Sequence, residues 1–315
     1  MDVNRVAAID CGTNSIRLLI ADRLEGRLRD VHREMRIVRL GQGVDATGQF
    51  APDALERTRA ALVDYAALLD RFEVPTVRMV ATSATRDAAN RDVFFAMTAE
   101  VLGRVVPGAV AEVITGAEEA ELSFNGAVGE LNSDAAPFVV VDLGGGSTEV
   151  VLGGHGGVQA SYSADIGCVR LTERCLHSDP PTAVEIAAAR EVVRERLGEA
   201  LRVVPVEKAK TWVGVAGTFT TLAALAQNMT TYDSDAIHLS QVSFGQLLPV
   251  CDQLIGMTRA QRAALGPMHE GRVDVIGGGS IVVEELADAL GQRAGIDRLI
   301  VSEHDILDGI ALSIS

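Results

Sequence analysis

The chain alternates short apolar runs with polar, turn-forming segments, and this pattern predicts buried strands joined by turns and helices. Residues 6–9 and 16–21 are apolar runs of strand length on either side of the turn-rich residues 10–15. They predict a hairpin with a glycine at its tip. The second half begins in the same way, with apolar residues 138–141 and a second strand at 149–152. Strands that alternate with helical segments are typical of an α/β fold.

Helical spacing dominates the stretch between these two hairpins. A helix is expected from Pro52, followed by a strand at residues 77–81 and a loop at residues 82–90. Asn90 is expected to cap the next helix, which Gly103 ends. The inner face of that helix is predicted to consist of Val93, Phe94, Met97 and Val101.

Three further segments predict helices that begin at polar or glycine-rich turns. Thr115 and Glu118 have the spacing of a capping box, so a helix is expected from about Gly116. Residues 213–216 and 273–276 each predict a strand that leads through a glycine turn into a helix. Such turns present backbone N–H groups and the positive end of a helix to an anion.

A repeated D-x-G-x-x-S pattern is the most informative feature of the chain. The first copy spans residues 10–15 and the second spans residues 142–147, each between two predicted strands. A repeat on this scale predicts two similar halves that face each other, each with one glycine hairpin. Two domains also fit the length of 315 residues, since single cores stop growing at roughly 250–300 residues.

Composition narrows the possible partners and excludes several kinds of site. A net charge of −15 argues against nonspecific binding to nucleic acid or to an anionic membrane. The only lysines are Lys208 and Lys210, so the chain lacks the lysine of a P-loop, whereas its arginines suit bidentate phosphate binding. The cysteines have no disulfide or zinc-like spacing, and the six histidines form no H-x-x-x-H pair, which gives a zinc site or a phosphohistidine little support.

The apolar runs are also too short to be membrane or export signals. A membrane span needs roughly 20 apolar residues, and residues 18–21 and 138–141 fall far below that length. Residues 6–9 are too few for the apolar region of a secretory signal. A soluble, cytoplasmic protein with reduced thiols is therefore expected.

The second glycine turn has the composition of a metal-assisted phosphate site. Three consecutive glycines lie between Asp142 and Glu149, which suits a loop that approaches an anion while carboxylates hold a divalent cation. A purely structural hairpin with a glycine bulge is the alternative. Glu149 stands where a dinucleotide fingerprint needs its third glycine, and a strand follows, so a Rossmann dehydrogenase is disfavoured.

The first glycine turn offers a related set of side chains. Asp10 is expected to order a metal ion or water, while Thr13, Asn14 and Ser15 donate to phosphate oxygens. An Asx-type turn that stabilises its own hairpin is the alternative. Arg17 lies in an otherwise apolar strand and requires an anionic partner, either a ligand phosphate or a structural carboxylate.

Three charged residues between the two turns complete the candidate chemistry. Arg86 is either a second phosphate clamp or an ordinary surface arginine. Glu118 and Glu119 fall in the first turn of the helix predicted from Gly116, where carboxylates commonly favour the helix dipole. That explanation fits Glu118. Glu119 points elsewhere around the helix, where it could orient and deprotonate an attacking water.

Seven ordered motifs resemble those of the exopolyphosphatase and guanosine pentaphosphate phosphohydrolase family. They are DCGTNSIR (10–17), SATRD (83–87), ITGAEEA (114–120), DLGGGSTE (142–149), GCVRLTE (167–173), GTFTTL (217–222) and VSEHDILDG (301–309). The family belongs to the superfold of actin, sugar kinases and heat-shock chaperones. The resemblance implies an α/β fold of two ribonuclease-H-like (actin-like) domains with an interdomain cleft. Domain I is expected at residues 1–120 with a C-terminal helix at about 302–315, and domain II at 121–301.

The resemblance also implies roles for individual residues. Glu119 is implied as the general base, and Glu149 as a second catalytic residue that positions water. Asp142, Glu149 and Asp10 are the implied magnesium ligands, and a requirement for a monovalent cation such as K⁺ stays open. The implied phosphate-binding residues are Gly12, Thr13, Asn14, Ser15, Arg17, Arg86, Gly144, Gly145, Gly146 and Ser147. The family further implies a homodimer.

The predicted activity is magnesium-dependent hydrolysis of the terminal phosphate of inorganic polyphosphate. The alternatives are hydrolysis of the 5′ γ-phosphate of guanosine pentaphosphate at the same site and a non-catalytic sensor that binds guanosine tetraphosphate. A kinase of the same superfold would need a nucleotide base pocket that the sequence does not reveal. Long family members continue into a helical module beyond the position of Ser315, so the chain resembles the short form and short polyphosphate is the expected substrate.

Overall fold

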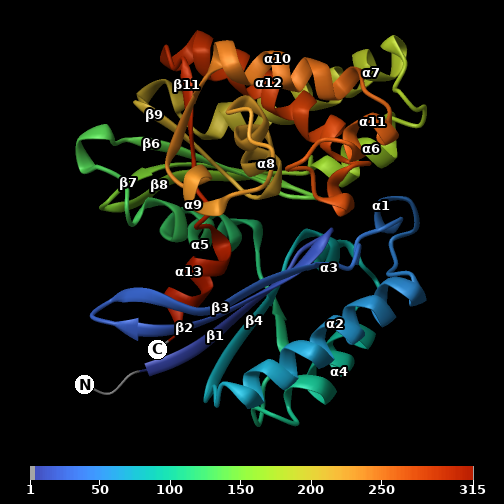
Figure 1. Ribbon diagram of the computed structural model, residues 1–315, viewed down its shortest axis with the longest axis vertical. Coiled ribbons are helices and arrows are strands. Elements are labelled where there is room, and N and C mark those ends of the chain that lie inside the picture. The colour runs from blue at the N-terminus through green and yellow to red at the C-terminus, as the bar shows by residue number, and fades with distance from the viewer. Residues whose placement is uncertain (1–3, 315) are drawn as a thin grey trace. The chain divides into compact units, whose positions relative to one another are not determined.

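The chain folds into two compact units, which the computed structural model describes over residues 4–314 (Figure 1). Unit 1 comprises Met1–Gly126 and Ile306–Ser315, and unit 2 comprises Ala127–Asp305. The chain therefore enters unit 2 near the end of helix α5 (Gly116–Val128) and leaves it just before helix α13 (Ile306–Ser313). Among the described helices, none is both long and apolar enough to cross a membrane.

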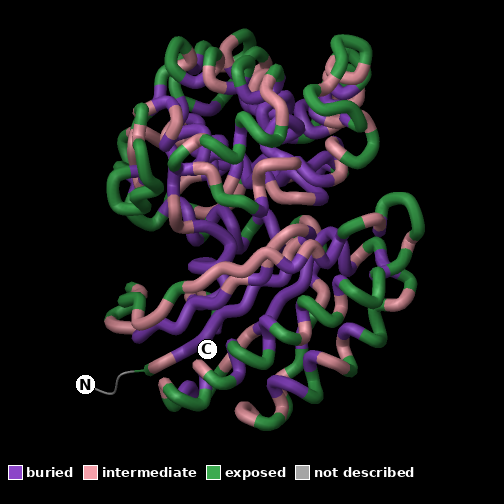
Figure 2. The backbone as a smooth tube through the Cα atoms, turned by 45° about the vertical axis from the view of Figure 1, so that its right-hand side comes forward, coloured by how far each residue is buried: buried purple, intermediate pink, exposed green. Residues whose placement is uncertain are grey.

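Unit 1 is built on a five-stranded mixed sheet. Its order is β3-β2-β1-β4-β5, in which β1, β2 and β3 are antiparallel neighbours while β4 and β5 run parallel to β1. The residues of β1 and β2 are mostly buried, whereas those of the edge strand β3 are only partly covered (Figure 2). The bounds are β1 Asn4–Cys11, β2 Ser15–Leu24, β3 Arg27–Ile37, β4 Thr76–Ala81 and β5 Ala111–Val113.

Helices pack against both faces of this sheet. On one face α2 (Pro52–Arg71) and α4 (Arg91–Leu102) form a core with the strands, centred on residues such as Tyr65 and Phe94. On the other face α13 buries Ile306 and Ile310 against β1 and β2. The short helices α1 (Val44–Thr47) and α3 (Ser83–Asp87) lie in the connections.

Unit 2 repeats this plan with one additional strand. Its sheet has the order β10-β11-β9-β6-β7-β8, in which β6, β7 and β8 are antiparallel and β9 runs parallel to β6. β11 runs parallel to β9, and β10 adds an antiparallel edge. The bounds are β6 Phe138–Leu143, β7 Thr148–Gly154, β8 Gly157–Ala164, β9 Thr211–Val215, β10 Ser240–Ser243 and β11 Arg298–Val301.

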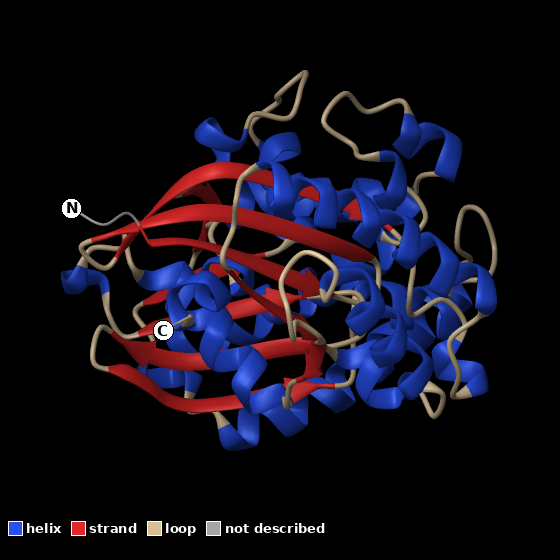
Figure 3. Cartoon of the chain, turned by 90° about the horizontal axis from the view of Figure 1, so that it is seen from below, coloured by secondary structure: helices blue, strands red, loops and turns tan. Residues whose placement is uncertain are grey.

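The buried residues of the helices and strands of unit 2 form one large hydrophobic core. Figure 3 shows the helices and strands of the chain from below. Trp212 and Phe219 meet edge to face in this core, with ring centroids 5.6 Å apart, and α12 is buried along most of its length. The α-helices are α6 Cys168–Cys175, α7 Ala183–Val203, α8 Gly217–Ala226, α9 Ser234–Ile237, α10 Phe244–Gly256, α11 Arg259–Ala263 and α12 Ile276–Ala294. Three short 3₁₀ helices are η1 Ser133–Ala135, η2 Val206–Lys208 and η3 Glu270–Arg272.

The shared strand order confirms the predicted fold class. In both units three antiparallel strands are followed by two strands parallel to the first, which is the ribonuclease-H-like, actin-like arrangement. The two D-x-G-x-x-S segments connect the equivalent pairs β1–β2 and β6–β7. The sequence repeat therefore reflects a structural repeat.

Three predictions about the stretch between the hairpins were wrong in detail. The expected loop at residues 82–90 contains helix α3. Asn90 occupies the N-cap position of α4, but its side chain makes no capping bond and instead binds both the N–H and the carbonyl of Phe50. Val93 was assigned to the inner face of α4, yet it is 56% exposed. The helix packs through Phe94, Thr98 and Val101.

The segment at residues 273–276 was also wrongly predicted as a strand followed by a glycine turn. Helix α12 begins at Ile276, and the three glycines lie inside its first turns. A Cβ at Gly277 would lie 2.6 Å from the Arg262 guanidinium, and one at Gly278 would lie 2.5 Å from the Thr172 hydroxyl. These glycines therefore permit close packing of a buried helix.

Candidate active site

Three predicted segments of unit 1 meet at one edge of its sheet. β1, β4 and β5 are parallel, so the residues that follow them lie at the same carboxyl edge. The Thr82 N–H donates to the Cys11 carbonyl, and the Ile114 N–H donates to the Ala81 carbonyl. The first glycine turn, helix α3 and the start of α5 are thereby brought together.

In the first glycine turn, the carbonyl groups of Thr13 and Asn14 both point toward residues 38–41. The Thr13 carbonyl accepts the Gly41 N–H at 2.8 Å, and the Asn14 carbonyl accepts the N–H groups of Val38 and Arg39. In a trans peptide the N–H points opposite to the carbonyl. The N–H groups of Asn14 and Ser15 therefore point away from residues 38–41, in the manner of an anion-binding turn.

The buried Thr13 hydroxyl adds to this picture. Its oxygen is inaccessible to solvent and has no hydrogen-bond partner among the described residues. Buried polar atoms are nearly always hydrogen-bonded in native proteins, so this hydroxyl retains its capacity to donate to a ligand. The role of Thr13 in binding phosphate stays a prediction.

Arg17 is paired with a carboxylate of its own hairpin. Asp10 and Arg17 are direct cross-strand partners on β1 and β2. The Nε and Nη2 atoms of Arg17 lie 2.9 and 2.7 Å from the same oxygen of Asp10. The structure thus provides the structural carboxylate that the sequence left as one of two alternatives, and the charge of Asp10 is met by an arginine.

Glu119 is a buried carboxylate at the start of α5. Its Oε2 atom lies 2.6 Å from Nη1 of Arg86, and the Thr82 hydroxyl also donates to it. Burial raises the pKa of Glu119 to about 6, while the Arg86 guanidinium acts in the opposite direction and Asp10 adds a smaller upward contribution. A carboxylate poised near neutral pH suits a general base.

The neighbouring Glu118 occupies a different environment, as predicted. Its side chain is half-exposed and pairs with Arg78 at 2.7 Å. The Glu118 N–H is held by the Thr115 hydroxyl, which supplies half of the predicted capping box. Successive positions on a helix point about 100° apart, so only Glu119 turns toward α3.

The second glycine turn repeats the backbone arrangement of the first. The Gly144 carbonyl accepts the Cys168 N–H, and the Gly145 carbonyl accepts the N–H groups of Val169 and Arg170. By the same peptide geometry, the N–H groups of Gly145 and Gly146 point away from α6. Helix α6 therefore fixes the turn with its first N–H groups and leaves the amides of the turn facing elsewhere.

Asp142 and Glu149 occupy the positions in the second hairpin that Asp10 and Arg17 occupy in the first. They are direct cross-strand partners on β6 and β7, so their side chains leave the same face of the sheet. Both residues are buried, and the Ser163 hydroxyl donates to Glu149 at 2.7 Å. Like charges directly opposite each other on neighbouring strands repel.

Sequence reasoning missed the residues that shape the two turns. A Cβ at Gly41 would lie 2.3 Å from the Thr13 methyl carbon, and a Cβ at Gly167 would lie 2.4 Å from the Gly145 carbonyl oxygen. Arg272 was also missed. Its guanidinium packs on Gly217 at the start of α8 and donates to the Thr221 hydroxyl at 2.9 Å. Gly167 and Gly217 stand in recognised motifs, whereas nothing in the local sequence marks Gly41 or Arg272.

Comparison with known proteins identifies the relatives of this chain. The family model described as the Ppx/GppA phosphatase family matches residues 19–314. A Mycobacterium tuberculosis protein named Exopolyphosphatase 2 is 73% identical, with 100% of both chains covered. A Pseudoalteromonas translucida guanosine-5'-triphosphate,3'-diphosphate pyrophosphatase is 33% identical over 74% of this chain and 45% of its own length.

A solved structure agrees with this assignment. The crystal structure of an exopolyphosphatase-like protein superposes with a TM-score of 0.93 at 44% identity and covers 99% of this chain and 98% of that one. Both the sequence match and the structural match extend over the two units described above. The chain belongs to the Ppx/GppA phosphatase family.

Proposed function

We propose that this protein is an exopolyphosphatase, which hydrolyses the terminal phosphoryl group of inorganic polyphosphate and releases orthophosphate. The observation that carries the proposal is Glu119, a buried carboxylate whose pKa is raised to about 6 beside Arg86. Outward-facing amides at the two glycine turns supply anion-binding groups. The name of the relative that is 73% identical supports polyphosphate as the substrate class.

The residues present fit a bound magnesium ion in unit 2. Asp142 and Glu149 offer carboxylate oxygens, the ligand type that Mg²⁺ prefers, and their side chains leave the same face of the sheet. Asp10 was predicted as a third ligand, but its charge is already met by Arg17. We therefore assign the magnesium-binding role to Asp142 and Glu149. A bound Mg²⁺ would neutralise charge on the phosphate oxygens.

The proposed reaction is a single displacement by water. Glu119 removes one proton from the water while the oxygen of the water forms a bond to the terminal phosphorus. The bond from that phosphorus to the bridging oxygen breaks, and the bridging oxygen leaves with the electron pair on the shortened chain. The backbone amides of the first glycine turn, which belongs to the same unit as Glu119, stabilise charge on the phosphoryl oxygens. Orthophosphate and a polyphosphate shorter by one unit are the products.

Guanosine pentaphosphate is the second candidate substrate. The observation that favours it is the 33% identical relative, whose name specifies a guanosine polyphosphate. Hydrolysis of its 5′ γ-phosphate would use the same base, Glu119. A preference for short polyphosphate, a homodimer, a cytoplasmic location and a monovalent cation requirement stay predictions.

A competition assay tests the substrate assignment. Purified protein with Mg²⁺ is given short polyphosphate, long polyphosphate and guanosine pentaphosphate, separately and mixed, and orthophosphate release is measured. We expect the highest kcat/KM with polyphosphate, and higher with short chains than with long ones. A higher kcat/KM with guanosine pentaphosphate would transfer the assignment to that substrate. Tight alarmone binding without turnover of any substrate would favour a sensor.

A further inference from the structure

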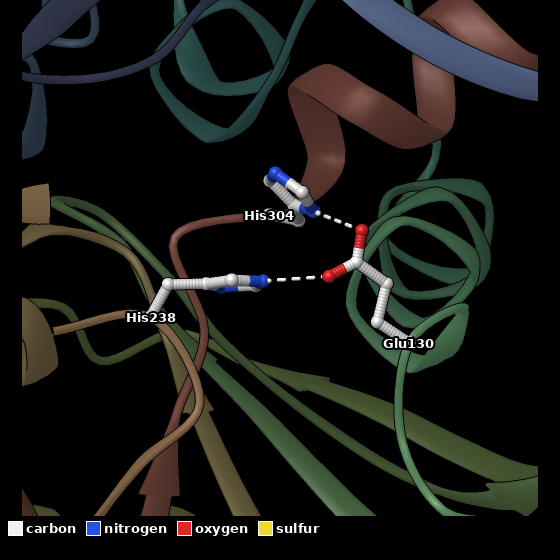
Figure 4. A group of neighbouring side chains, drawn as sticks. All are labelled: Glu130, His238 and His304. Carbon is white, nitrogen blue, oxygen red and sulfur yellow. Dashed lines mark hydrogen bonds and ion pairs between the residues drawn. The ribbon is translucent and has the colours of Figure 1, made fainter. Parts of the chain in front are cut away.

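Three chain segments of unit 2 bring two imidazoles and a carboxylate together. Glu130 lies in the turn after α5, His238 ends α9, and His304 follows β11 (Figure 4). Their ligand atoms all lie within 4.8 Å of one another, and no other such group of three occurs among residues 4–314. Sequence analysis found little support for a zinc site, because these residues are far apart in the chain.

The carboxylate of Glu130 lies between the two rings. The Nε2 atom of His238 is 3.0 Å from Oε2 of Glu130, and Nδ1 of His304 is 3.7 Å from Oε1. The ring centroids are 4.4 Å apart and the ring planes are tilted by 42°. In a tetrahedral zinc site with bonds of roughly 2.0–2.1 Å, neighbouring ligand atoms lie about 3.4 Å apart. The observed distances fall on either side of that value.

The backbone around the cluster holds His304 in place and orients the ring of His238 through one hydrogen bond that coordination would break. The Ser302 hydroxyl donates to the His304 carbonyl at 2.8 Å and accepts the His304 N–H at 3.0 Å, and Ser302 is fully buried. The Glu303 N–H donates to Nδ1 of His238 at 3.2 Å, while the Glu303 side chain accepts a bond from the Tyr232 hydroxyl. Glu130 is more than half exposed, which leaves a path for an ion from solvent.

We propose that Glu130, His238 and His304 form a binding site for a zinc-class divalent cation, separate from Asp142 and Glu149. Two imidazole nitrogens and one carboxylate are a ligand set for Zn²⁺, and they leave a fourth position for water. Mg²⁺ prefers oxygen ligands alone and is a poor competitor here. The ion would join the segment that enters unit 2 to the segment that leaves it.

Metal binding must overcome one hydrogen bond of His238. In the neutral ring Nδ1 accepts the Glu303 N–H, so Nε2 carries the proton and donates it to Glu130. Coordination through Nε2 moves that proton to Nδ1, and the Glu303 N–H loses its acceptor. The site therefore requires a cation that binds imidazole strongly, which favours Zn²⁺ over Mg²⁺.

Direct metal binding tests the proposal. The full chain is stripped with a chelator and titrated calorimetrically with Zn²⁺ in the presence of millimolar Mg²⁺. We expect one Zn²⁺ per chain and a raised melting temperature, because a ligand that binds only the folded state stabilises it. His304→Ala, His238→Ala and the exposed Glu130→Gln should each weaken Zn²⁺ binding about tenfold or more. His177→Ala, an exposed histidine of unit 2 outside the cluster, should not.

The visible absorption spectrum of bound Co²⁺ identifies which side chains are the ligands. Co²⁺ bound at the proposed site should give visible bands of a nitrogen and oxygen site without thiolate charge transfer. The proposal is overturned if the wild type binds no Zn²⁺ stoichiometrically, or if all three cluster variants bind it as the wild type does. Thiolate bands that vanish in Cys175→Ala, the half-buried cysteine, would also overturn it.

Discussion

At the scale of the residue, one register position distinguishes the chemistry of the two hairpins. The partner across from Asp10 is Arg17, whereas the partner across from Asp142 is Glu149. The first pair is internally neutral and the second carries two like charges. The structural repeat therefore places an acid beside a base in the first hairpin and two carboxylates side by side in the second, and carboxylate oxygens are the ligands that Mg²⁺ prefers.

Replacing Glu149 should accordingly weaken magnesium binding. Glu149→Gln keeps the shape of the side chain but removes one of the two facing charges, so the Mg²⁺ concentration for half-maximal activity should rise by about tenfold or more. The measurement is orthophosphate release against Mg²⁺ concentration. Glu195→Gln, an exposed change on α7, is the control. An unchanged Mg²⁺ dependence in Glu149→Gln would remove Glu149 from the metal site.

The pairing of Glu119 with Arg86 predicts a pH dependence. Glu119 must be ionised to accept a proton, so kcat/KM should fall as the pH drops through about 6. The guanidinium stabilises the ionised carboxylate, and Arg86→Met should therefore raise the pKa of Glu119 and shift the acid limb upward by about one unit or more.

Arg78→Met is the matched control for this experiment. Arg78 pairs with Glu118 rather than Glu119, so its loss should leave the acid limb in place. The profile of kcat/KM against pH is measured for the wild type and both variants. A downward shift in Arg86→Met, or an equal shift in both variants, would contradict the proposed pairing.

At the scale of the element, each glycine turn depends on a second glycine far away in the sequence. Gly41 approaches Thr13 in unit 1, and Gly167 approaches the backbone of Gly145 in unit 2. In both cases N–H groups of the adjacent segment hold the carbonyls of the turn, which directs its amides the other way. The direction of the anion-binding amides therefore depends on both the glycine turn and the adjacent segment that binds its carbonyls.

Gly167→Ala should therefore impair phosphate binding. Its Cβ would lie 2.4 Å from the carbonyl carbon and oxygen of Gly145, so the turn must move. We expect KM for polyphosphate to rise by about tenfold, with far-UV circular dichroism unchanged. Gly156→Ala is the control, because its Cβ would meet nothing within 4 Å. Equal kinetic effects of the two changes would show that the turn is not specifically affected.

The sequence predicted most of the elements but not how they contact one another. The strands and helices were predicted from the local spacing of apolar residues, and the two equivalent hairpins were predicted from the D-x-G-x-x-S repeat. Helix α3 was missed because only five residues form it, and the glycines of α12 resembled a phosphate turn although they serve packing. The partner of Arg17 was left open, and Gly41 and Arg272 were missed, because tertiary contacts alone reveal them.

At the scale of the whole molecule, the net charge of −15 opposes the approach of a polyanionic substrate. Added salt shortens the Debye length from about 30 Å at 0.01 M to about 8 Å at 0.15 M. KM for polyphosphate should therefore fall over this range at fixed free Mg²⁺.

Tetramethylammonium chloride and potassium chloride are compared to separate screening from specific ion binding. Screening predicts the same fall in KM with both salts, and an additional effect of potassium alone would reveal a monovalent site. A KM that rises with both salts would show that local attraction at the anion-binding groups outweighs the net charge of the molecule.

The measurement that tests the central claim most directly is polyphosphate hydrolysis by Glu119→Gln. The account predicts that kcat falls by at least about 100-fold while polyphosphate binding is retained, because the amide cannot accept the proton of water. It also predicts a variant at least as stable as the wild type at pH 7. The folded-state pKa is raised from 4.5 to about 6, so ionisation of Glu119 costs stability as pH rises through that window, on the order of 2 kcal/mol. A folded Glu119→Gln variant that retains wild-type kcat would contradict the account.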